Sequence, residues 1–223
     1  GQVPLSMIGT DAFQEVDTYG LTIPITKHNF LVRSAKELLT AVPAAFRIAM
    51  SDRPGPVLID VPKDVQNQMV SFEEFPDVVV PDAAPSFDIA AIEEAAKMIE
   101  AAERPVLYLG GGVIHSGAAH MAVTLAEQAS LPTTMTLMAL GAMPMDHPLS
   151  LGMLGMHGAR YTNYVLEEAD LLICVGARFD DRAIGKTAEF CPNAKIIHVD
   201  IDRSELHKVK NAHVAIAGDV AQV

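Results

Sequence analysis

The sequence has 223 residues, of which 50% are apolar and 20% are charged, so it can form one large or two small domains. The formal net charge is −12 and the lysines and arginines form no runs, which excludes the clustered positive charge that nucleic-acid binding needs. No apolar stretch is long enough to cross a bilayer and no signal peptide opens the sequence, so we expect no membrane partner. Cys174 and Cys191 form no disulfide framework, which indicates a reducing, cytoplasmic location.

Residues 1–65 predict part of an α/β unit. The expected elements, in chain order, are a short helix near 12–16, a helix over 35–50 and an apolar strand over 57–61. Ser34 and Glu37 have the spacing of a capping box at the start of the second helix. Residues 66–85 are rich in proline and acidic side chains and are interpreted as an interdomain linker.

Residues 86–223 alternate between strand-like and helix-like stretches. The expected strands cover 105–109, 132–137, 171–175, 195–199 and 214–217. The expected helices cover 88–102, 116–128, 159–168 and 203–208, and a loop rich in Met, Gly and Pro covers 138–156. This alternation predicts an α/β fold, a doubly wound parallel sheet with a Rossmann-like central domain, preceded by part of a second α/β domain.

Glycine turns follow several of the expected strands, at the edge where open α/β sheets bind ligands. The triple glycine 110–112 makes either a tight turn with close helix packing or a contact to phosphate. Gly155 and Gly158 would let the backbone approach a bound group, and the amides that open a helix near Gly158 could face an anion. Gly176 ends the strand at 171–175.

The charged residues that follow two of the expected strands each allow two interpretations. Residues 180–182 (Asp-Asp-Arg) are either a solvated cluster or part of a site beyond a central strand. Asp200 and Asp202 end another strand and either accept ribose hydroxyls or cap a helix. His198 alternates with apolar neighbours and is expected to be a satisfied core histidine. Because no metal-ligand spacing and no nucleophile elbow occur, the residues alone predict a nucleotide-binding α/β protein, with both ends looking cut from a longer polypeptide.

Three motifs together resemble one enzyme family. DAFQE (11–15), GMLGMHG (152–158) and GARFDDR (176–182) are similar to the catalytic large subunit of acetohydroxyacid synthase (acetolactate synthase), a thiamine-diphosphate enzyme, and most of all to its bacterial isozyme I type. RPGPVLIDVPKDVQ (53–66) and RPVLYLGGGV (104–113) match as well. The resemblance implies three regions: residues 1–65 as the C-terminal part of a pyrimidine-binding domain, 66–85 as a linker, and 86–223 as the central FAD-binding domain.

The resemblance also implies a reaction and partners. Family members condense two pyruvates, or pyruvate and 2-oxobutyrate, with loss of CO2 in branched-chain amino-acid biosynthesis. They are homodimers of catalytic subunits with a small regulatory subunit, and their FAD is structural. Thiamine diphosphate and Mg²⁺ take their main ligands from sequence outside these residues, so no metal ligand is predicted here and the piece alone is expected to be inactive.

The resemblance assigns two sets of residues by position. The residues matching FAD contacts are Arg53, Gly110, Gly111, Gly112, Thr136, Leu137, Met138, Met156, His157, Gly158, Gly176, Ala177, Arg178, Asp180, Asp200, Ile201, Gly218 and Asp219. The residues matching the catalytic substrate channel are Phe13, Gln14, Lys63, Met156, Asp181 and Arg182. Arg182 matches the arginine that meets the second substrate's carboxylate, a task that suits the guanidinium fork.

The sequence departs from the family pattern at two places, and two alternative interpretations of its function remain. Leu5-Ser6 stands where many relatives carry basic residues, and His115 stands where relatives often have Asn. The alternatives are a sister thiamine-diphosphate enzyme, such as a pyruvate oxidase or glyoxylate carboligase, and a bare nucleotide-binding module.

Overall fold

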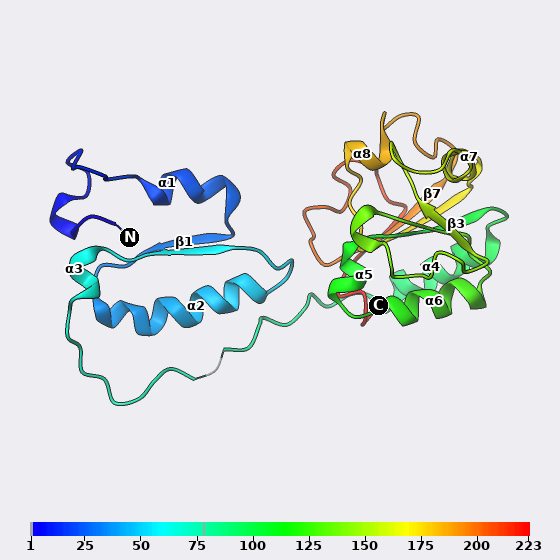
Figure 1. Ribbon diagram of the computed structural model, residues 1–223. Helices are drawn as coiled ribbons and strands as arrows, with labels where there is room; N and C mark the ends of the chain where they lie inside the picture. The colour runs from blue at the N-terminus through cyan, green and yellow to red at the C-terminus, as the bar shows by residue number, and fades with distance from the viewer. Residues whose placement is uncertain (1, 78) are drawn as a thin grey trace. The chain divides into compact units, whose positions relative to one another are not determined.

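The computed structural model describes residues 2–77 and 79–223, and the chain divides into two compact units, Gly1–Ala83 (unit 1) and Ala84–Val223 (unit 2) (Figure 1). Residue 1, in the predicted domain 1–65, and residue 78, in the predicted linker, lie outside the described residues. None of the helices within the described residues is long and apolar enough to cross a membrane.

Unit 1 is built on a two-stranded parallel sheet. Its elements are η1 (Leu5–Met7), α1 (Thr18–Thr22), η2 (Ile23–Ile25), β1 (His28–Leu31), η3 (Ala35–Glu37), α2 (Leu38–Met50), β2 (Val57–Asp60) and α3 (Lys63–Gln66). The strands pair from His28 with Val57 to Leu31 with Asp60, and α1 and α2 lie on opposite sides of them (Figure 1). The core is small, with Val32 as its only described residue of 0% exposure.

The first helix of unit 1 was predicted at the wrong place. Residues 12–16 form turns because Gln14 has a left-handed φ of 63°, and the carboxylate of Glu15 accepts the amides of Gly9 and Ala12. The helix α1 begins later, where the carboxylate of Asp17 caps it.

The second predicted helix is confirmed, with a tighter first turn than expected. Residues 35–50 comprise η3 and α2, and the hydroxyl of Ser34 accepts the amide of Glu37 at 3.3 Å. The carboxylate of Glu37 accepts the amide of Arg33 at 2.7 Å, one residue before the cap, so only half of the predicted capping box forms. The strand β1 was missed, because His28 and Asn29 hide its apolar pattern.

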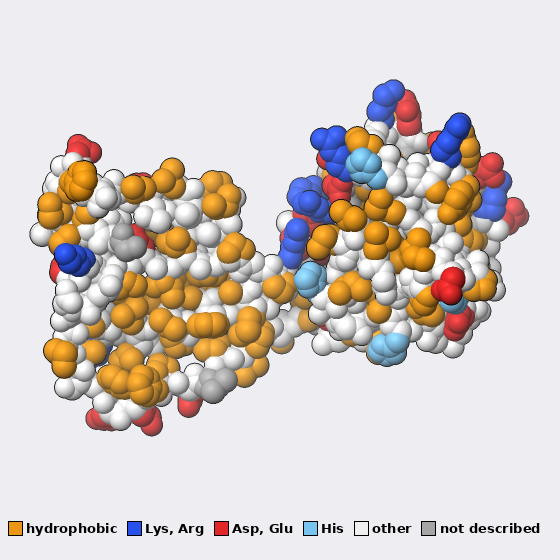
Figure 2. Space-filling view, viewed as in Figure 1, with side chains coloured by type: hydrophobic (Ala, Val, Ile, Leu, Met, Phe, Trp, Pro, Cys, Tyr) orange, Lys and Arg blue, Asp and Glu red, His pale blue; other side chains and the backbone are white. Residues whose placement is uncertain are grey.

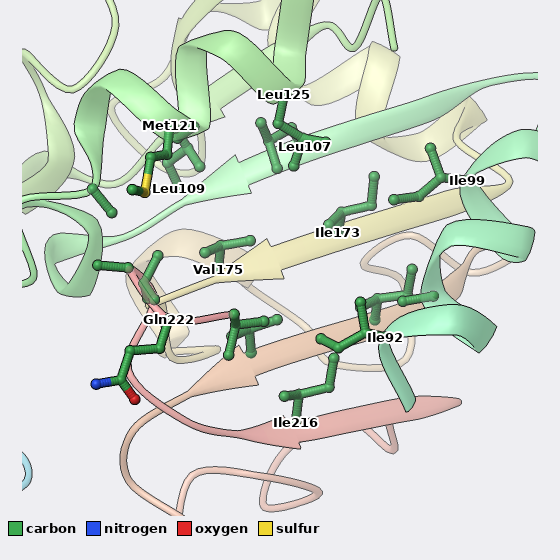
Figure 3. Close-up of a pocket in the computed structure, with 18 of the residues that line it drawn as sticks. Ile92, Ile99, Leu107, Leu109, Met121, Leu125, Ile173, Val175, Ile216 and Gln222 are labelled. Carbon is green, nitrogen blue, oxygen red and sulfur yellow. The ribbon is translucent and has the colours of Figure 1, made fainter. Parts of the chain in front are cut away.

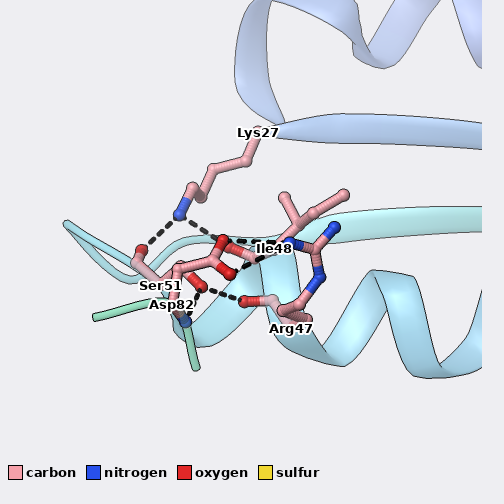
Figure 4. Close-up of polar contacts among 5 residues, drawn as sticks. All are labelled: Lys27, Arg47, Ile48, Ser51 and Asp82. Atoms are coloured by element: carbon pink, nitrogen blue, oxygen red, sulfur yellow. Dashed lines mark hydrogen bonds and ion pairs between the residues drawn. The ribbon is translucent and has the colours of Figure 1, made fainter. Parts of the chain in front are cut away.

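The segment after α3 has no helix or strand among its described residues up to Asp88, as expected of the predicted linker 66–85. Its end is nevertheless attached to unit 1. The guanidinium of Arg47 donates to both carboxylate oxygens of Asp82 at 3.0 and 3.2 Å, and the amide of Asp82 donates to the hydroxyl of Ser51 at 2.8 Å (Figure 4). These contacts explain why unit 1 extends to residue 83.

Unit 2 is a doubly wound parallel sheet, as predicted. Its elements are α4 (Ile89–Ala101), β3 (Pro105–Leu109), α5 (Gly111–His115), α6 (Ala119–Gln128), β4 (Thr133–Met135), η4 (Leu137–Ala139), β5 (Ser150–Met153), α7 (Arg160–Glu168), β6 (Leu171–Val175), α8 (Asp181–Ile184), β7 (Lys195–Asp200) and β8 (Val214–Ala217). The strand order is β5-β4-β3-β6-β7-β8, with every pair parallel. The chain leaves β3 toward β4 and leaves β6 toward β7, so the order reverses between β3 and β6.

Alternate residues of the central strands face opposite sides of the sheet. Leu107 and Ile173 share one core with α4 and α6, whereas Tyr108 and Cys174 share a second core with α7 and α8. Figure 1 shows these two pairs of helices on opposite sides of the sheet. Both faces of β6 are therefore buried, which is why its sequence is a continuous apolar run.

A groove remains on the face that carries α4 and α6 (Figure 3). It encloses about 430 Å³, and its described lining is apolar except for Gln222. Its floor is formed by the buried side chains of β3, β6, β7 and β8, and its walls include Ile99 of α4 and Leu125 of α6.

Three predictions for unit 2 need correction. The predicted helix at 203–208 is wrong: the carboxylate of Asp202 binds the amide and hydroxyl of Ser204, and His207 has a φ of 61°, so the segment forms turns. The helix expected over 116–128 is α6, which begins only at Ala119 because Gly117, with its φ of 71°, precedes it, and the short helix α5 before residue 116 was missed. The predicted loop 138–156 contains the edge strand β5.

Candidate functional site

The predicted cofactor residues of unit 2 follow the carboxyl ends of its parallel strands. They come after β3 (Gly110, Gly111, Gly112), β4 (Thr136, Leu137, Met138), β5 (Met156, His157, Gly158), β6 (Gly176, Ala177, Arg178, Asp180), β7 (Asp200, its last residue, and Ile201) and β8 (Gly218, Asp219). Because all six strands are parallel, these residues lie along one edge of the sheet, which includes the point where the strand order reverses. We call this the carboxyl edge.

The triple glycine joins the turn after β3 to the turn after β6. A Cβ atom on Gly110 would lie 2.1 Å from the carbonyl oxygen of Gly176, and one on Gly112 would lie 2.7 Å from the Gly176 Cα. The amide of Gly110 donates to the Val175 carbonyl and that of Gly112 to the Gly176 carbonyl, both at 2.9 Å. Two of the three glycines thus serve close packing, which was one of the two interpretations left open, and Gly111 lies beside Met138 instead.

The segment after β4 combines an orphaned hydroxyl with exposed apolar side chains. The Thr136 Oγ1 atom is buried and has no hydrogen-bond partner among the described residues. Leu137 and Met138 are 70% and 69% exposed. A polar group without a partner beside uncovered apolar surface fits a ligand that has both hydrogen-bonding and flat apolar parts, as FAD has.

Two loops of the carboxyl edge are held together by their backbones. The amide of Met156 donates to the carbonyl of Arg182 at 3.0 Å. Gly155 has a φ of 81°, and a Cβ there would lie 2.4 Å from that same carbonyl oxygen. The structure therefore brings the predicted residues Met156 and His157, both exposed, next to Asp181 and Arg182.

The charged cluster at 180–182 has a mixed role. The Asp180 carboxylate caps α8, accepting the amides of Arg182 and Ala183 at 3.0 and 3.2 Å. Asp181 and Arg182 have exposed side chains, at 81% and 73%, and their charged atoms are 3.8 Å apart. Asp180 is thus structural in these contacts, while Arg182 presents its guanidinium to solvent.

The carboxylates that end β7 differ in their surroundings. Asp200 is only 9% exposed, its Oδ1 accepts the amide of Asp202 at 2.9 Å, and burial raises its pKa above the ordinary value. Asp202 binds Ser204 at the start of the following turn, and because residues 203–208 form turns rather than a helix, the interpretation that it caps a helix is wrong.

Four predicted residues belong to unit 1. Phe13 is 89% exposed, Gln14 has a φ of 63°, and Lys63 is the exposed first residue of α3. Arg53 lies in the exposed turn between α2 and β2. Within the described ranges of both units, no group of three or more His, Cys, Asp or Glu side chains could hold a metal ion.

The sequence did not predict the role of three buried side chains beneath the loop that carries Arg182. Tyr108, Cys174 and His198 donate hydrogen bonds to the backbone carbonyls of that loop. No sequence signal marks them, because the strand register that makes them neighbours across β3, β6 and β7 is known only from the fold. The expectation for His198 is half confirmed, since Nε2 has a partner and the buried Nδ1 has none among the described residues.

Residues 92–223 match the family described as "Thiamine pyrophosphate enzyme, central domain". The chain belongs to the thiamine pyrophosphate enzyme family. It is 67% identical along its whole length to the acetolactate synthase isozyme 1 large subunit of Escherichia coli (strain K12), of which it covers 39%. It is 48% identical along its whole length to the probable acetolactate synthase large subunit of Methanocaldococcus jannaschii, again covering 39% of the relative.

A further relative supports the same grouping within the thiamine pyrophosphate enzymes. The chain is 47% identical, over 99% of its length, to the acetolactate synthase isozyme 2 large subunit of Escherichia coli (strain K12) and covers 40% of it. The resemblance inferred from the motifs is thus confirmed, and the chain spans about two fifths of the length of these relatives.

Proposed function

We propose that this chain is part of an acetolactate synthase large subunit in which unit 2 holds FAD along the carboxyl edge. The observation that carries this proposal is the gathering of the predicted flavin residues at that edge, beside the orphaned hydroxyl of Thr136. The whole polypeptide is expected to condense two pyruvates, or pyruvate and 2-oxobutyrate, with loss of CO2. It would do so in the cytoplasm, as a homodimer with a small regulatory subunit.

The residues of the edge suggest how the flavin would be held. The hydroxyl of Thr136 would hydrogen-bond the flavin, and the exposed side chains of Leu137 and Met138 would cover its ring. Arg178, which is exposed, would supply a positive charge to its phosphates, and Asp200 would accept a hydroxyl of its adenosine end. Arg53, also exposed, is proposed as a flavin residue from its match to the family alone.

The substrate channel is proposed for Phe13, Gln14, Lys63, Met156, Asp181 and Arg182. Thiamine diphosphate, when bound with Mg²⁺, supplies the electron sink for the loss of CO2. The task of Arg182 would be to orient the carboxylate of the second 2-oxo acid. We expect these 223 residues alone to show no turnover of pyruvate, because no GDG motif, which in relatives holds the magnesium and diphosphate, occurs in them.

The test of the flavin site uses the full-length polypeptide reconstituted with FAD. After desalting, the protein should retain the visible absorbance of flavin. Thr136→Val removes only the orphaned hydroxyl, so it should weaken FAD affinity by about fivefold to tenfold, the effect of one hydrogen bond, without lowering the stability of the apoprotein. Thr124→Val is the matched control, since the Thr124 hydroxyl bonds the His120 carbonyl on α6. Absence of retained flavin from the wild-type protein would refute the proposal.

The test of the channel uses Arg182→Ala in the same holoenzyme. Loss of a charge-assisted contact of about 2–4 kcal/mol should slow the joining of the second 2-oxo acid by about 30-fold or more, while the first decarboxylation is spared. Arg104→Ala, at the opposite edge of the sheet before β3, is the control. Equal losses in both half-reactions would mean that Arg182 is structural.

A further inference from the structure

Three polar side chains form a row beneath the loop 176–182. Tyr108 of β3 pairs with Cys174 of β6, and Cys174 pairs with His198 of β7, so the three are direct cross-strand neighbours. Each has 0% exposure, and Tyr108 and Cys174 belong to the core shared with α7 and α8. Polar groups at three adjacent positions of a buried sheet need partners.

The loop carbonyls supply those partners. The Tyr108 hydroxyl donates to the Arg178 carbonyl at 3.3 Å. The Cys174 thiol and the His198 Nε2 donate to the Ala177 carbonyl at 3.1 and 2.9 Å. Because a carbonyl only accepts, this contact places the His198 proton on Nε2.

Burial keeps all three donors protonated and uncharged. It raises the pKa of the Tyr108 hydroxyl and the Cys174 thiol far above their ordinary ranges. It lowers the pKa of His198, so the imidazole is neutral at physiological pH. The three side chains therefore remain neutral donors to the loop at neutral pH.

The same loop is fixed from its own side by Phe179. The Phe179 ring is 4% exposed and meets the His198 ring edge-on, with centroids 5.1 Å apart and planes at 70°. Its centroid is 6.2 Å from that of Tyr108. The sheet thus holds the carbonyls of 177 and 178 and the Phe179 ring on the buried side of the loop. Arg178 and Arg182 remain exposed on its other side.

We propose that Tyr108, Cys174 and His198 are positioning residues, which fix the backbone of 177–179 so that Arg178 and Arg182 are presented at the carboxyl edge. This inference rests on the proposed function for what the two arginines meet. All three side chains are buried, so the row acts through the loop. Its energetic role is to satisfy carbonyls that the loop would otherwise bury without partners.

The first test needs no flavin. In the chain of 223 residues, hydrogen exchange is measured for the backbone amides of 177–185, with those of α4, which packs on the other face of the same sheet, as an internal reference. His198→Met removes the donor at similar size and should speed exchange in this segment by about tenfold. His198→Gln places an amide nitrogen where Nε2 stood and should restore protection to within about threefold of wild type.

The tyrosine provides a second, matched pair of variants. Tyr108→Phe removes only the hydroxyl and should also speed exchange in 177–185, by a smaller factor than His198→Met because its bond is longer. Tyr161→Phe, at an α7 position that is 59% exposed, should leave exchange unchanged. If His198→Met and Tyr108→Phe exchange at the wild-type rate in this segment, the positioning role is overturned.

The second test separates the inference from the proposed function. In full-length protein loaded with FAD, His198→Met should weaken FAD affinity by about fivefold or more and change the visible circular dichroism of the flavin, and His198→Gln should restore both. If His198→Met exchanges faster yet binds FAD with wild-type affinity and dichroism, the positioning role for this site is overturned. If wild-type protein retains no FAD, the proposed function fails, while the exchange rates still decide whether the row fixes the loop.

Discussion

At the scale of single residues, we expect His198 to make the stability of unit 2 depend on pH. Its Nε2 has the Ala177 carbonyl as partner, whereas its buried Nδ1 has none among the described residues. Burial is the largest cause lowering its pKa below the ordinary 6.5, and His207 acts in the same direction. The carbonyl contact and the carboxylates of Asp200 and Glu205 act in the opposite direction.

The stability of unit 2 should therefore fall as the pH drops below about 6.5. The unfolded chain takes up a proton on this histidine near its ordinary pKa, while the folded chain takes it up only at lower pH. Between those two pKa values the free energy of unfolding should decrease by at most about 1.4 kcal/mol per pH unit. Urea unfolding between pH 8 and pH 5.5 should show this slope in wild type and less of it in His198→Gln.

A second buried group acts with the opposite sign, and both proteins in that comparison retain it. Burial raises the pKa of Asp200 above the ordinary 3.8, so its protonation favours the folded state at lower pH. Equal slopes for wild type and His198→Gln would mean that His198 does not supply the pH dependence.

The triple glycine offers a residue-scale test of packing against ligand contact. Gly110→Ala should destabilise unit 2 by about 2–3 kcal/mol or more, because its new Cβ would lie 2.1 Å from the Gly176 carbonyl oxygen, where backbone meets backbone. Gly111→Ala is the matched control. Its Cβ would lie 3.1 Å from the Met138 Cβ, and its stability should change by less than about 1 kcal/mol.

Thermal and urea unfolding of the two variants check this contrast. Equal stabilities for Gly110→Ala and Gly111→Ala would contradict the packing role given to the first glycine. A normal stability combined with weakened FAD binding in Gly111→Ala would identify the middle glycine as the one that approaches the ligand.

At the scale of elements, the C-terminal end of helix α2 is held by a cluster of hydrogen bonds. The Lys27 ammonium donates to the carbonyls of Ile48 and Ser51, both at 2.6 Å, at the end of the helix where the dipole favours a cation (Figure 4). The Ser51 hydroxyl donates to the Arg47 carbonyl at 2.6 Å and accepts the Asp82 amide. The turn that follows, 52–56, carries the predicted flavin residue Arg53.

Lys27→Met should loosen this end of α2. It keeps most of the aliphatic stem but removes two charge-assisted hydrogen bonds, which costs about 1–2 kcal/mol at an exposed site. Hydrogen exchange of the last turn of α2 and of 52–56 should accelerate, whereas Lys36→Met, on an exposed position of η3, should not change it. Unchanged exchange in Lys27→Met would show that the bonds to the helix end contribute nothing.

Strands with an unbroken apolar run could be predicted from the sequence, whether central or at the edge of the sheet, and strands with a broken pattern could not. The bounds of β3, β6 and β8 agree with the expected ranges, because continuous apolar runs flanked by turn residues have few alternatives. The edge strand β5 was not predicted, because Gly152, with its φ of 68°, and a register shift opposite Thr133 break its pattern. Left-handed residues such as His207 ended segments that looked helical, and side-chain type alone does not reveal them.

The candidate site shows the same division. Its strand-end residues could be predicted, because parallel strands bring their carboxyl ends to one edge whatever the loops do. The hydrogen-bond donors Tyr108, Cys174 and His198 could not be predicted, since their alignment depends on the register between three strands. The partnerless hydroxyl of Thr136 is likewise a property of packing that no motif encodes.

At the scale of the whole molecule, the two units differ in how completely they bury apolar side chains. Unit 2 has a six-stranded sheet with a core on each face. Unit 1 has a two-stranded sheet, and Figure 2 shows apolar side chains gathered over much of its visible face. Its exposed large apolar side chains include Phe13 at 89%, Ile25 at 69%, Leu21 at 66% and Phe46 at 60%.

These differences predict that unit 2 folds alone and unit 1 does not. A two-stranded sheet is marginal without further cover, and contiguous apolar surface of this kind marks a face that another part of a protein covers. Residues 84–223 expressed alone should unfold in one cooperative transition, within about 5 °C of the same transition in the whole chain, because a shift of that size corresponds to about 1 kcal/mol. Residues 1–83 alone should show no cooperative transition and should bind a hydrophobic dye strongly.

A single core variant identifies which transition belongs to unit 2. Leu172 has 0% exposure and lies in the central strand β6, so Leu172→Ala should destabilise residues 84–223 by about 2–5 kcal/mol and shift their transition by roughly 10 °C or more. The same shift should appear in one transition of the whole chain.

Since the groove between α4 and α6 leaves apolar lining open to solvent, residues 84–223 should also bind the dye weakly while folded. A cooperative transition in residues 1–83 would show that the small core around Val32 suffices, and that the apolar face of unit 1 needs no cover to fold.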